Sequence, residues 1–108
     1  MNLQIDLLPT ASGTVLRLAG RVDSLTAPEL ETALTPFLER GMLPELDMVG
    51  LTYISSAGLR VLMAAAKTLR RKGKDLTICA ISPQVDQALR LAGFAHLFSI
   101  ASCKGGAR

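Results

Sequence analysis

The sequence predicts a single α/β domain whose mixed, mostly parallel β-sheet opens with an antiparallel hairpin and carries helices mainly on one face. Two observations lead to this prediction. The chain has 108 residues, of which 49% are hydrophobic and 19% charged, which suffices for one compact core but not for two. After two initial strand-like segments, helical and strand-like apolar patterns alternate, and this order is typical of parallel strands joined by right-handed crossovers.

The first two segments predict the hairpin. Leu3, Ile5 and Leu7 alternate with polar residues, as expected of a half-buried strand. Residues 9–13 have the composition of a turn, and residues 14–19 form a second apolar run. An antiparallel pair is the simplest structure for two strands joined by so short a connection.

A first helix is predicted from Thr26 to about Glu39. Thr26 is a suitable N-cap, with Pro28 in the first turn and Glu29 at the third helical position. Apolar residues then recur at helical spacing, and Gly41 provides a stop.

The remaining segments alternate strand and helix. The expected elements are a strand over 43–49 followed by a short turn, a helix over 56–72 ended by Gly73, a strand over 76–81, a helix that starts at Ser82-Pro83 and ends at Gly93, and an edge strand over 96–100. Residues 1–108 form one domain in this prediction, with a flexible tail over about 103–108.

A pair of hydroxyl residues, Ser55-Ser56, lies at the predicted start of the 56–72 helix. Ser55 as N-cap would satisfy an unpaired backbone N–H, and Ser56 would point outward. A phosphate is well tolerated at a helix start because the dipole is positive there. Gly58 would leave room for another protein's active site to approach. The alternative is an ordinary Ser-Ser cap with Gly58 as a close-packing residue.

The 56–72 helix has an apolar side and, roughly opposite it, a weakly apolar side. One stripe should face the sheet and consists of Leu59, Leu62, Met63, Ala66 and Leu69. The other contains Ala57, Val61, Ala64 and Thr68, with Arg60 and Arg71 alongside, where a solvated helix would normally carry more charge. This second side is interpreted as a docking face for another protein, unless its alanines only reflect high helix propensity.

Composition argues against several locations and partners. Cys79 and Cys103 do not resemble a disulfide framework, no apolar run approaches membrane-spanning length, and no signal-like segment opens the chain. A cytoplasmic protein without membrane insertion is therefore expected.

The basic run over 67–74 contains no aromatic residue and lies at a helix C-terminus, where cations are stabilised by the dipole. Direct nucleic-acid binding is not expected.

The sequence also argues against an enzyme. Its one histidine, His96, lies far from the serine pair along the chain, and a general base would have to lie close to its nucleophile. The aspartates show no metal-ligand spacing, and no glycine-rich phosphate loop occurs. We expect no catalytic residue, no metal and no cofactor.

Three segments in the same order and spacing resemble one family, the STAS-domain anti-sigma factor antagonists. They are residues 20–30 (GRVDSLTAPEL), Leu46-Asp47 followed by residues 53–59 (YISSAGL), and Gly93-Phe94 through Leu97-Phe98. The resemblance covers nearly the whole chain and implies a STAS-like fold.

The resemblance also implies a function. In this family a serine kinase of the histidine-kinase-like ATPase type, itself the anti-sigma factor or its relative, phosphorylates the serine that aligns with Ser56. The unphosphorylated antagonist binds that kinase, phosphorylation ends the binding, and a serine phosphatase restores it. Many members carry aspartate before the acceptor, whereas this chain has Ser55, which becomes a possible second acceptor.

The expected partner-binding residues come from two places. The resemblance places the loop that contains Asp23, Ser24 and Thr26 beside the acceptor, and the helix contributes Ser55, Ala57, Gly58, Arg60, Val61 and Ala64.

An alternative function keeps the same fold, because STAS domains also serve as subunits of lipid-transport ATPase complexes. Such a subunit would dock through the same helix without phosphorylation.

Overall fold

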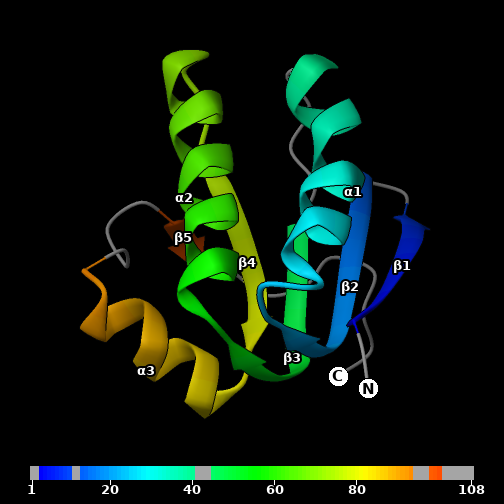
Figure 1. Cartoon of the computed structure of the whole chain (residues 1–108). Helices are drawn as coiled ribbons and strands as arrows, with labels where there is room; N and C mark the ends of the chain where they lie inside the picture. Colours follow the sequence, from blue (N-terminus) through cyan, green and yellow to red (C-terminus); the bar gives the residue numbers. More distant parts are fainter. Residues whose placement is uncertain (1–2, 11–12, 41–44, 94–97, 101–108) are drawn as a thin grey trace.

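The computed structural model describes residues 3–10, 13–40, 45–93 and 98–100 and shows the predicted α/β architecture (Figure 1). The elements in chain order are β1 (Leu3–Thr10), β2 (Gly13–Val22), α1 (Ala27–Arg40), β3 (Glu45–Ile54), α2 (Ser56–Arg71), β4 (Leu76–Ile81), α3 (Pro83–Leu91) and β5 (Phe98–Ile100). The strands of the sheet follow the order β1-β2-β3-β4-β5. The β1–β2 pair is antiparallel and the other pairs are parallel, which confirms the predicted fold class.

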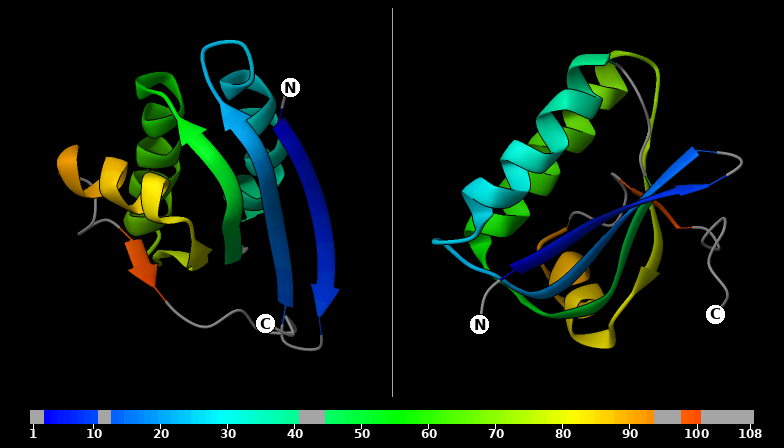
Figure 2. Two further views of the ribbon diagram at one scale, coloured as in Figure 1. Left: turned by 90° about the horizontal axis from the view of Figure 1, so that it is seen from below. Right: turned by 90° about the vertical axis from the view of Figure 1, so that its right-hand side faces the viewer.

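The helices α1 and α2 lie side by side on one face of the sheet (Figure 2). At their C-terminal ends the Lys72 ammonium donates to the Leu38 carbonyl at 2.7 Å. Between helices and sheet lies an aliphatic core, in which the large side chains without solvent contact include Leu16, Leu18, Leu30, Leu46, Met48, Leu51, Leu62 and Leu69. The third helix, α3, adds Val85 and Leu89 to the same core.

The strand β3 is longer than predicted. The predicted strand ends near Val49 and is followed by a turn before the serine pair, but β3 continues to Ile54. Its second half pairs with β2 alone, through a ladder that includes Leu51 opposite Gly20 and Ile54 opposite Val22. This pairing and the burial of Leu51 and Ile54 outweigh the turn-like composition around Gly50. The serine pair therefore follows a strand directly.

The predicted signals at the helix ends are mostly confirmed. The Ser82 hydroxyl accepts from the Val85 amide at 3.4 Å and donates to the Leu51 carbonyl at 2.7 Å, so that it caps α3 and joins it to β3. Gly73 follows the end of α2 with φ +77°, a left-handed conformation that glycine adopts without strain.

Other expectations differ from the structure or fall outside the described residues. Cys79 is disulfide-bonded, so the expectation that the cysteines form no disulfide framework is wrong for this residue. Gly41, His96 and the tail over 103–108 lie outside the described residues. Within the part of the chain that the structure describes, no helix combines the length and apolar character needed to cross a membrane.

Candidate functional site

The two serines before and at the start of α2 have different environments. Ser55 has extended backbone angles (φ −89°, ψ 175°), and its hydroxyl accepts a hydrogen bond from the Gly58 amide at 3.3 Å. Ser56 is the first residue of α2, and its side chain is exposed. The structure thus confirms the predicted N-cap and the outward position of Ser56. The Ser55 hydroxyl is engaged by the backbone, whereas the Ser56 side chain is exposed to solvent.

The loop between β2 and α1 is held by the carboxylate of Asp23. Its Oδ1 accepts from the amides of Leu25 at 2.9 Å and Thr26 at 3.1 Å. The hydrogen bond from the Thr26 amide holds the pKa of the Asp23 carboxyl below its ordinary value, with further contributions from the Leu25 amide, the Thr26 hydroxyl and the charge of Arg21. Asp23 is therefore the residue that orders this loop.

Thr26 occupies the expected position but has a different role. Its carbonyl accepts the first helical bonds of α1, from Glu29 and Leu30, whereas its hydroxyl accepts from the Asp23 amide at 2.9 Å and donates to the Arg21 carbonyl at 3.0 Å. The prediction that this hydroxyl caps α1 is wrong, because the loop uses it instead. Thr26 is also buried, so it is not available for contact with a partner.

Gly58 packs against the strands that lead into the site. A Cβ at this position would lie 2.6 Å from Cγ1 of Val22 and 2.7 Å from Cγ1 of Ile54. Both distances are too short for carbon atoms in contact. The structure therefore favours the alternative interpretation of Gly58, as a close-packing residue. Gly58 does not lie on the surface that a partner could reach.

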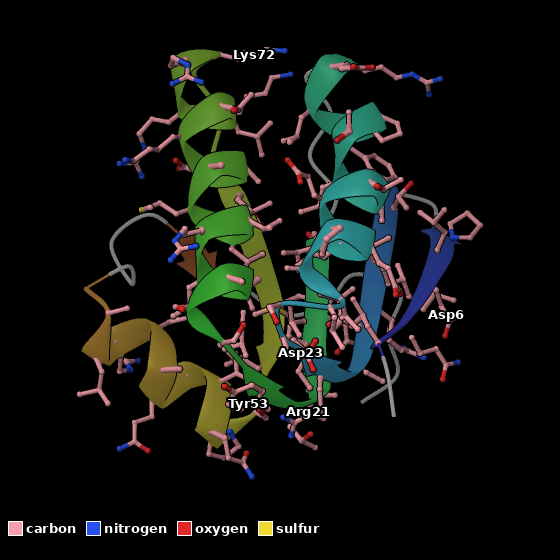
Figure 3. All side chains as sticks on the ribbon, in the orientation of Figure 1. Asp6, Arg21, Asp23, Tyr53 and Lys72 are labelled. Atoms are coloured by element: carbon pink, nitrogen blue, oxygen red, sulfur yellow. The ribbon has the colours of Figure 1, made fainter. Side chains whose placement is uncertain are left out.

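The strands β2 and β3, and the segments that follow them, meet at one end of the sheet. The Ser55 amide donates to the Val22 carbonyl at 2.8 Å, which fixes the start of α2 next to the loop that begins at Asp23. In Figure 3, Asp23, Arg21 and Tyr53 lie together at this end, near the starts of α1 and α2. The structure thus brings the Asp23 loop and the serine pair together, as the resemblance implied.

The surface of α2 differs from the predicted docking face. Its exposed stripe consists of Ser56, Arg60, Ala64, Lys67 and Arg71. Ala57, Val61 and Thr68 are half-buried, and the last two face α1 across a groove of about 150 Å³. The groove is lined by Glu31, Leu34, Thr35, Leu38, Val61, Ala64, Ala65 and Thr68. The weakly apolar side of α2 is therefore explained largely by its neighbour α1 within the same chain.

Two features of this end, an exposed leucine and a cation–π contact, are not among the predictions from the sequence. Leu25 is 82% exposed, although its amide is hydrogen-bonded to Asp23. The guanidinium of Arg21 lies 4.4 Å from the centre of the Tyr53 ring, a cation–π contact. The alternation of the two strands could have suggested the second feature, since Arg21 and Tyr53 are opposite each other in the β2–β3 register. Ser24, beside Leu25, is exposed as well.

This end of the sheet presents an ordered surface with an exposed hydroxyl at Ser56. Within the described ranges, no three His, Cys, Asp or Glu side chains are grouped so that they could hold a metal ion. Ser56 offers an accessible hydroxyl on a fixed backbone, bordered by an ordered loop and by the exposed residues of α2.

Comparison with known proteins identifies the family. The family described as "Mlab, STAS domain" matches residues 8–100. BtrV of Bordetella bronchiseptica, a proposed anti-sigma factor antagonist, is 37% identical over 91 residues, which cover 83% of this chain and 78% of BtrV. The chain belongs to the STAS-domain family of anti-sigma factor antagonists.

Solved structures show the same fold. An anti-sigma factor antagonist from Mycobacterium paratuberculosis superposes with a TM-score of 0.81 at 20% identity, covering 94% of this chain and 87% of the other. The phosphorylated form of SpoIIAA from Bacillus superposes with a TM-score of 0.67 at 16% identity, covering 93% and 91%. The anti-sigma factor antagonists are regulators rather than enzymes, which agrees with the expectation that this chain is not an enzyme.

Proposed function

We propose that this antagonist works by partner switching, with Ser56 as the phosphoacceptor. The unphosphorylated protein binds an anti-sigma factor that is also a serine kinase of the histidine-kinase-like ATPase type. Phosphorylation of Ser56 releases the complex, and a serine phosphatase reverses it. Because a sigma factor acts where RNA polymerase is, we place this exchange in the cytoplasm.

One observation carries the choice of acceptor. Ser56 is exposed at the first position of α2, whereas the hydroxyl of Ser55 already accepts from the Gly58 amide. A kinase can reach Ser56 without breaking the helix cap, but phosphorylation of Ser55 would replace that cap. The solved phosphorylated form of the structural relative SpoIIAA supports a phosphorylation switch on this fold.

The expected effect of the phosphate falls on the complex rather than on the fold. A phosphate adds about −1.5 to −2 charges at the start of a helix, where the dipole compensates it. At an interface, the same hydrated dianion must be matched by a cation or left solvated, and a buried unpaired charge weakens binding strongly. The partner surface of this chain is formed by Asp23, Ser24 and Leu25 of the loop together with Ser56, Arg60 and Ala64 of α2.

The test uses the histidine-kinase-like ATPase of the same genome and labelled ATP. We expect wild type and Ser55→Ala to incorporate phosphate and Ser56→Ala to incorporate none. Ser56→Asp should bind the kinase at least about tenfold more weakly than Ser56→Ala, a difference of about 1.4 kcal/mol. Normal labelling of Ser56→Ala would show that the acceptor is a different residue.

The second candidate is a STAS subunit of a lipid-transport ATPase complex, which docks without phosphorylation. It is supported by the exposed stripe of α2, which offers an ordered surface whether or not Ser56 is modified. Co-purification with a membrane ATPase that is equally strong for wild type and Ser56→Asp would favour this candidate. Loss of a kinase complex in Ser56→Asp favours partner switching.

A further inference from the structure

The helix α2 is the only one of the three described helices without an acidic residue in its first turn. Glu29 lies in the first turn of α1 and Asp86 in that of α3. All sixteen residues of α2 are described, and they include four cations but no carboxylate. Negative charge near a helix N-terminus is stabilising, because the dipole is positive there. A phosphate on Ser56 would supply the charge that α2 lacks.

The helix α3 shows how this chain pairs such an anion. Asp86 in its first turn accepts from Nε of Arg90 at 3.0 Å, and the two residues are four positions apart. Ser56 and Arg60 have the same spacing at the start of α2, and both are exposed. At this spacing the side chains lie on one face, and an anion that precedes its cation is the favourable order.

Arg60 is available for this pairing. Within the described part of the chain, Arg60 makes no hydrogen bond or ion pair. The neighbouring cations are engaged elsewhere: Arg21 lies over the Tyr53 ring, and Arg70 lies 3.4 Å from Asp75. Of the cations on the exposed stripe, Arg60 is the one within a single helical turn of Ser56.

We infer that Arg60 is the internal counter-ion of phosphorylated Ser56, an inference that rests on the proposed function. In the unphosphorylated protein the Arg60 guanidinium faces solvent and is open to an acidic group of the partner. In the phosphorylated protein it pairs with the phosphate along α2. Phosphorylation therefore changes the docking surface twice, by adding a dianion and by withdrawing a cation.

To test this inference, the protein is produced with phosphoserine incorporated at position 56 during its synthesis, so that no kinase is needed. Melting temperatures are measured with serine and with phosphoserine in wild type, Arg60→Gln and Lys67→Gln. Lys67 is the matched control, since it is an exposed cation on the same stripe, about three turns from Ser56. Phosphoserine should raise the melting temperature by about 2 °C more in wild type than in Arg60→Gln, and Lys67→Gln should behave like wild type.

A second readout is the Arg60 Nε–Hε resonance, which should shift on phosphorylation in the wild-type protein. An equal rise in melting temperature in wild type and Arg60→Gln would overturn the inference. The inference would also be overturned if this rise were reduced equally in Arg60→Gln and Lys67→Gln. An equal reduction would show that phosphoserine responds to the net charge of the protein rather than to a specific pair with Arg60. These outcomes concern Arg60 alone, whereas failure of the proposed function appears separately, as kinase labelling of Ser56→Ala.

Discussion

The backbone amide of Ser55 donates to the carbonyl of Val22 at 2.8 Å, and this bond joins the end of β2 to the cap of α2. The loop that begins at Asp23 and the helix that begins at Ser56 therefore share one support. Since the Gly58 backbone also packs on Val22 and Ile54, the surface around Ser56 is built directly on the core.

Gly58→Ala should destabilise the fold although alanine is the better helix former. The new Cβ would lie within 2.7 Å of side-chain atoms of both Val22 and Ile54, which are buried and have little room to move. Overpacking costs about 1–3 kcal/mol, and the higher helix propensity of alanine offsets up to about 1 kcal/mol. Chemical denaturation should show a net loss of about 1–2 kcal/mol.

The control for this substitution is a double-mutant cycle with Val22→Ala, which removes one of the two clashing groups. Gly58→Ala should cost less in the Val22→Ala background than in wild type, because neighbouring residues are energetically coupled. If the two substitutions had strictly additive effects on stability, the clash with Val22 would not be the cause of the destabilisation by Gly58→Ala.

Ser55→Ala should lower stability because it removes the helix cap. The Ser55 hydroxyl accepts from the Gly58 amide, and loss of such a cap costs about 1 kcal/mol. Ser56→Ala is the matched control, since it deletes the same hydroxyl one residue later on an exposed side chain and should stay within about 0.5 kcal/mol of wild type. Equal denaturation midpoints for the two variants would argue against this division of roles.

The loop should lose its support from Asp23 at acid pH. The folded-state pKa of Asp23 is lowered from 3.8, so the ionised carboxylate stabilises the fold above that value, and its contribution is lost as the pH falls through the lowered pKa. Melting temperatures of wild type and Asp23→Asn, measured from about pH 6 to about pH 2, should converge as the pH falls. If the difference in melting temperature between the two proteins stayed constant over this pH range, ionisation of Asp23 would not contribute to stability.

Leu25→Ser should weaken kinase binding without harming the fold. Leu25 is 82% exposed on an ordered loop, so its removal should change stability by no more than about 0.5 kcal/mol. Buried at an interface, an apolar anchor of this size is worth about 1.4 kcal/mol or more, which is about tenfold in affinity.

The control for Leu25 is Leu91→Ser, at the last residue of α3, where the leucine is 81% exposed. This variant should bind the kinase like wild type. If both variants bind equally well, or both are equally impaired, Leu25 has no specific part in the interface.

Much of the fold was predictable because its signals are local. Ser82-Pro83 marks the start of α3 in the sequence and caps it in the structure, and Gly73 ends α2 with a positive φ. The alternation of Leu3, Ile5 and Leu7 gave the first strand. Each of these signals depends on neighbouring residues only.

The features that were missed depend on contacts between distant segments. The extension of β3 to Ile54 is produced by pairing with β2, which the composition around Gly50 does not reveal. The role of Gly58 depends on Val22, 36 positions earlier in the chain. The half-buried side of α2 could not be assigned until α1 was placed beside it, and the Thr26 hydroxyl has a partner, Arg21, that no capping rule anticipates.

The hydrogen bonds that fix residues 23–26 also bear on the speed of regulation. An ordered loop and a capped helix need no folding step when a partner arrives, and surfaces of this kind associate at rates set mainly by diffusion and charge. Competing partners would then differ chiefly in residence time, so a single modification could redirect the antagonist by shortening the lifetime of one complex.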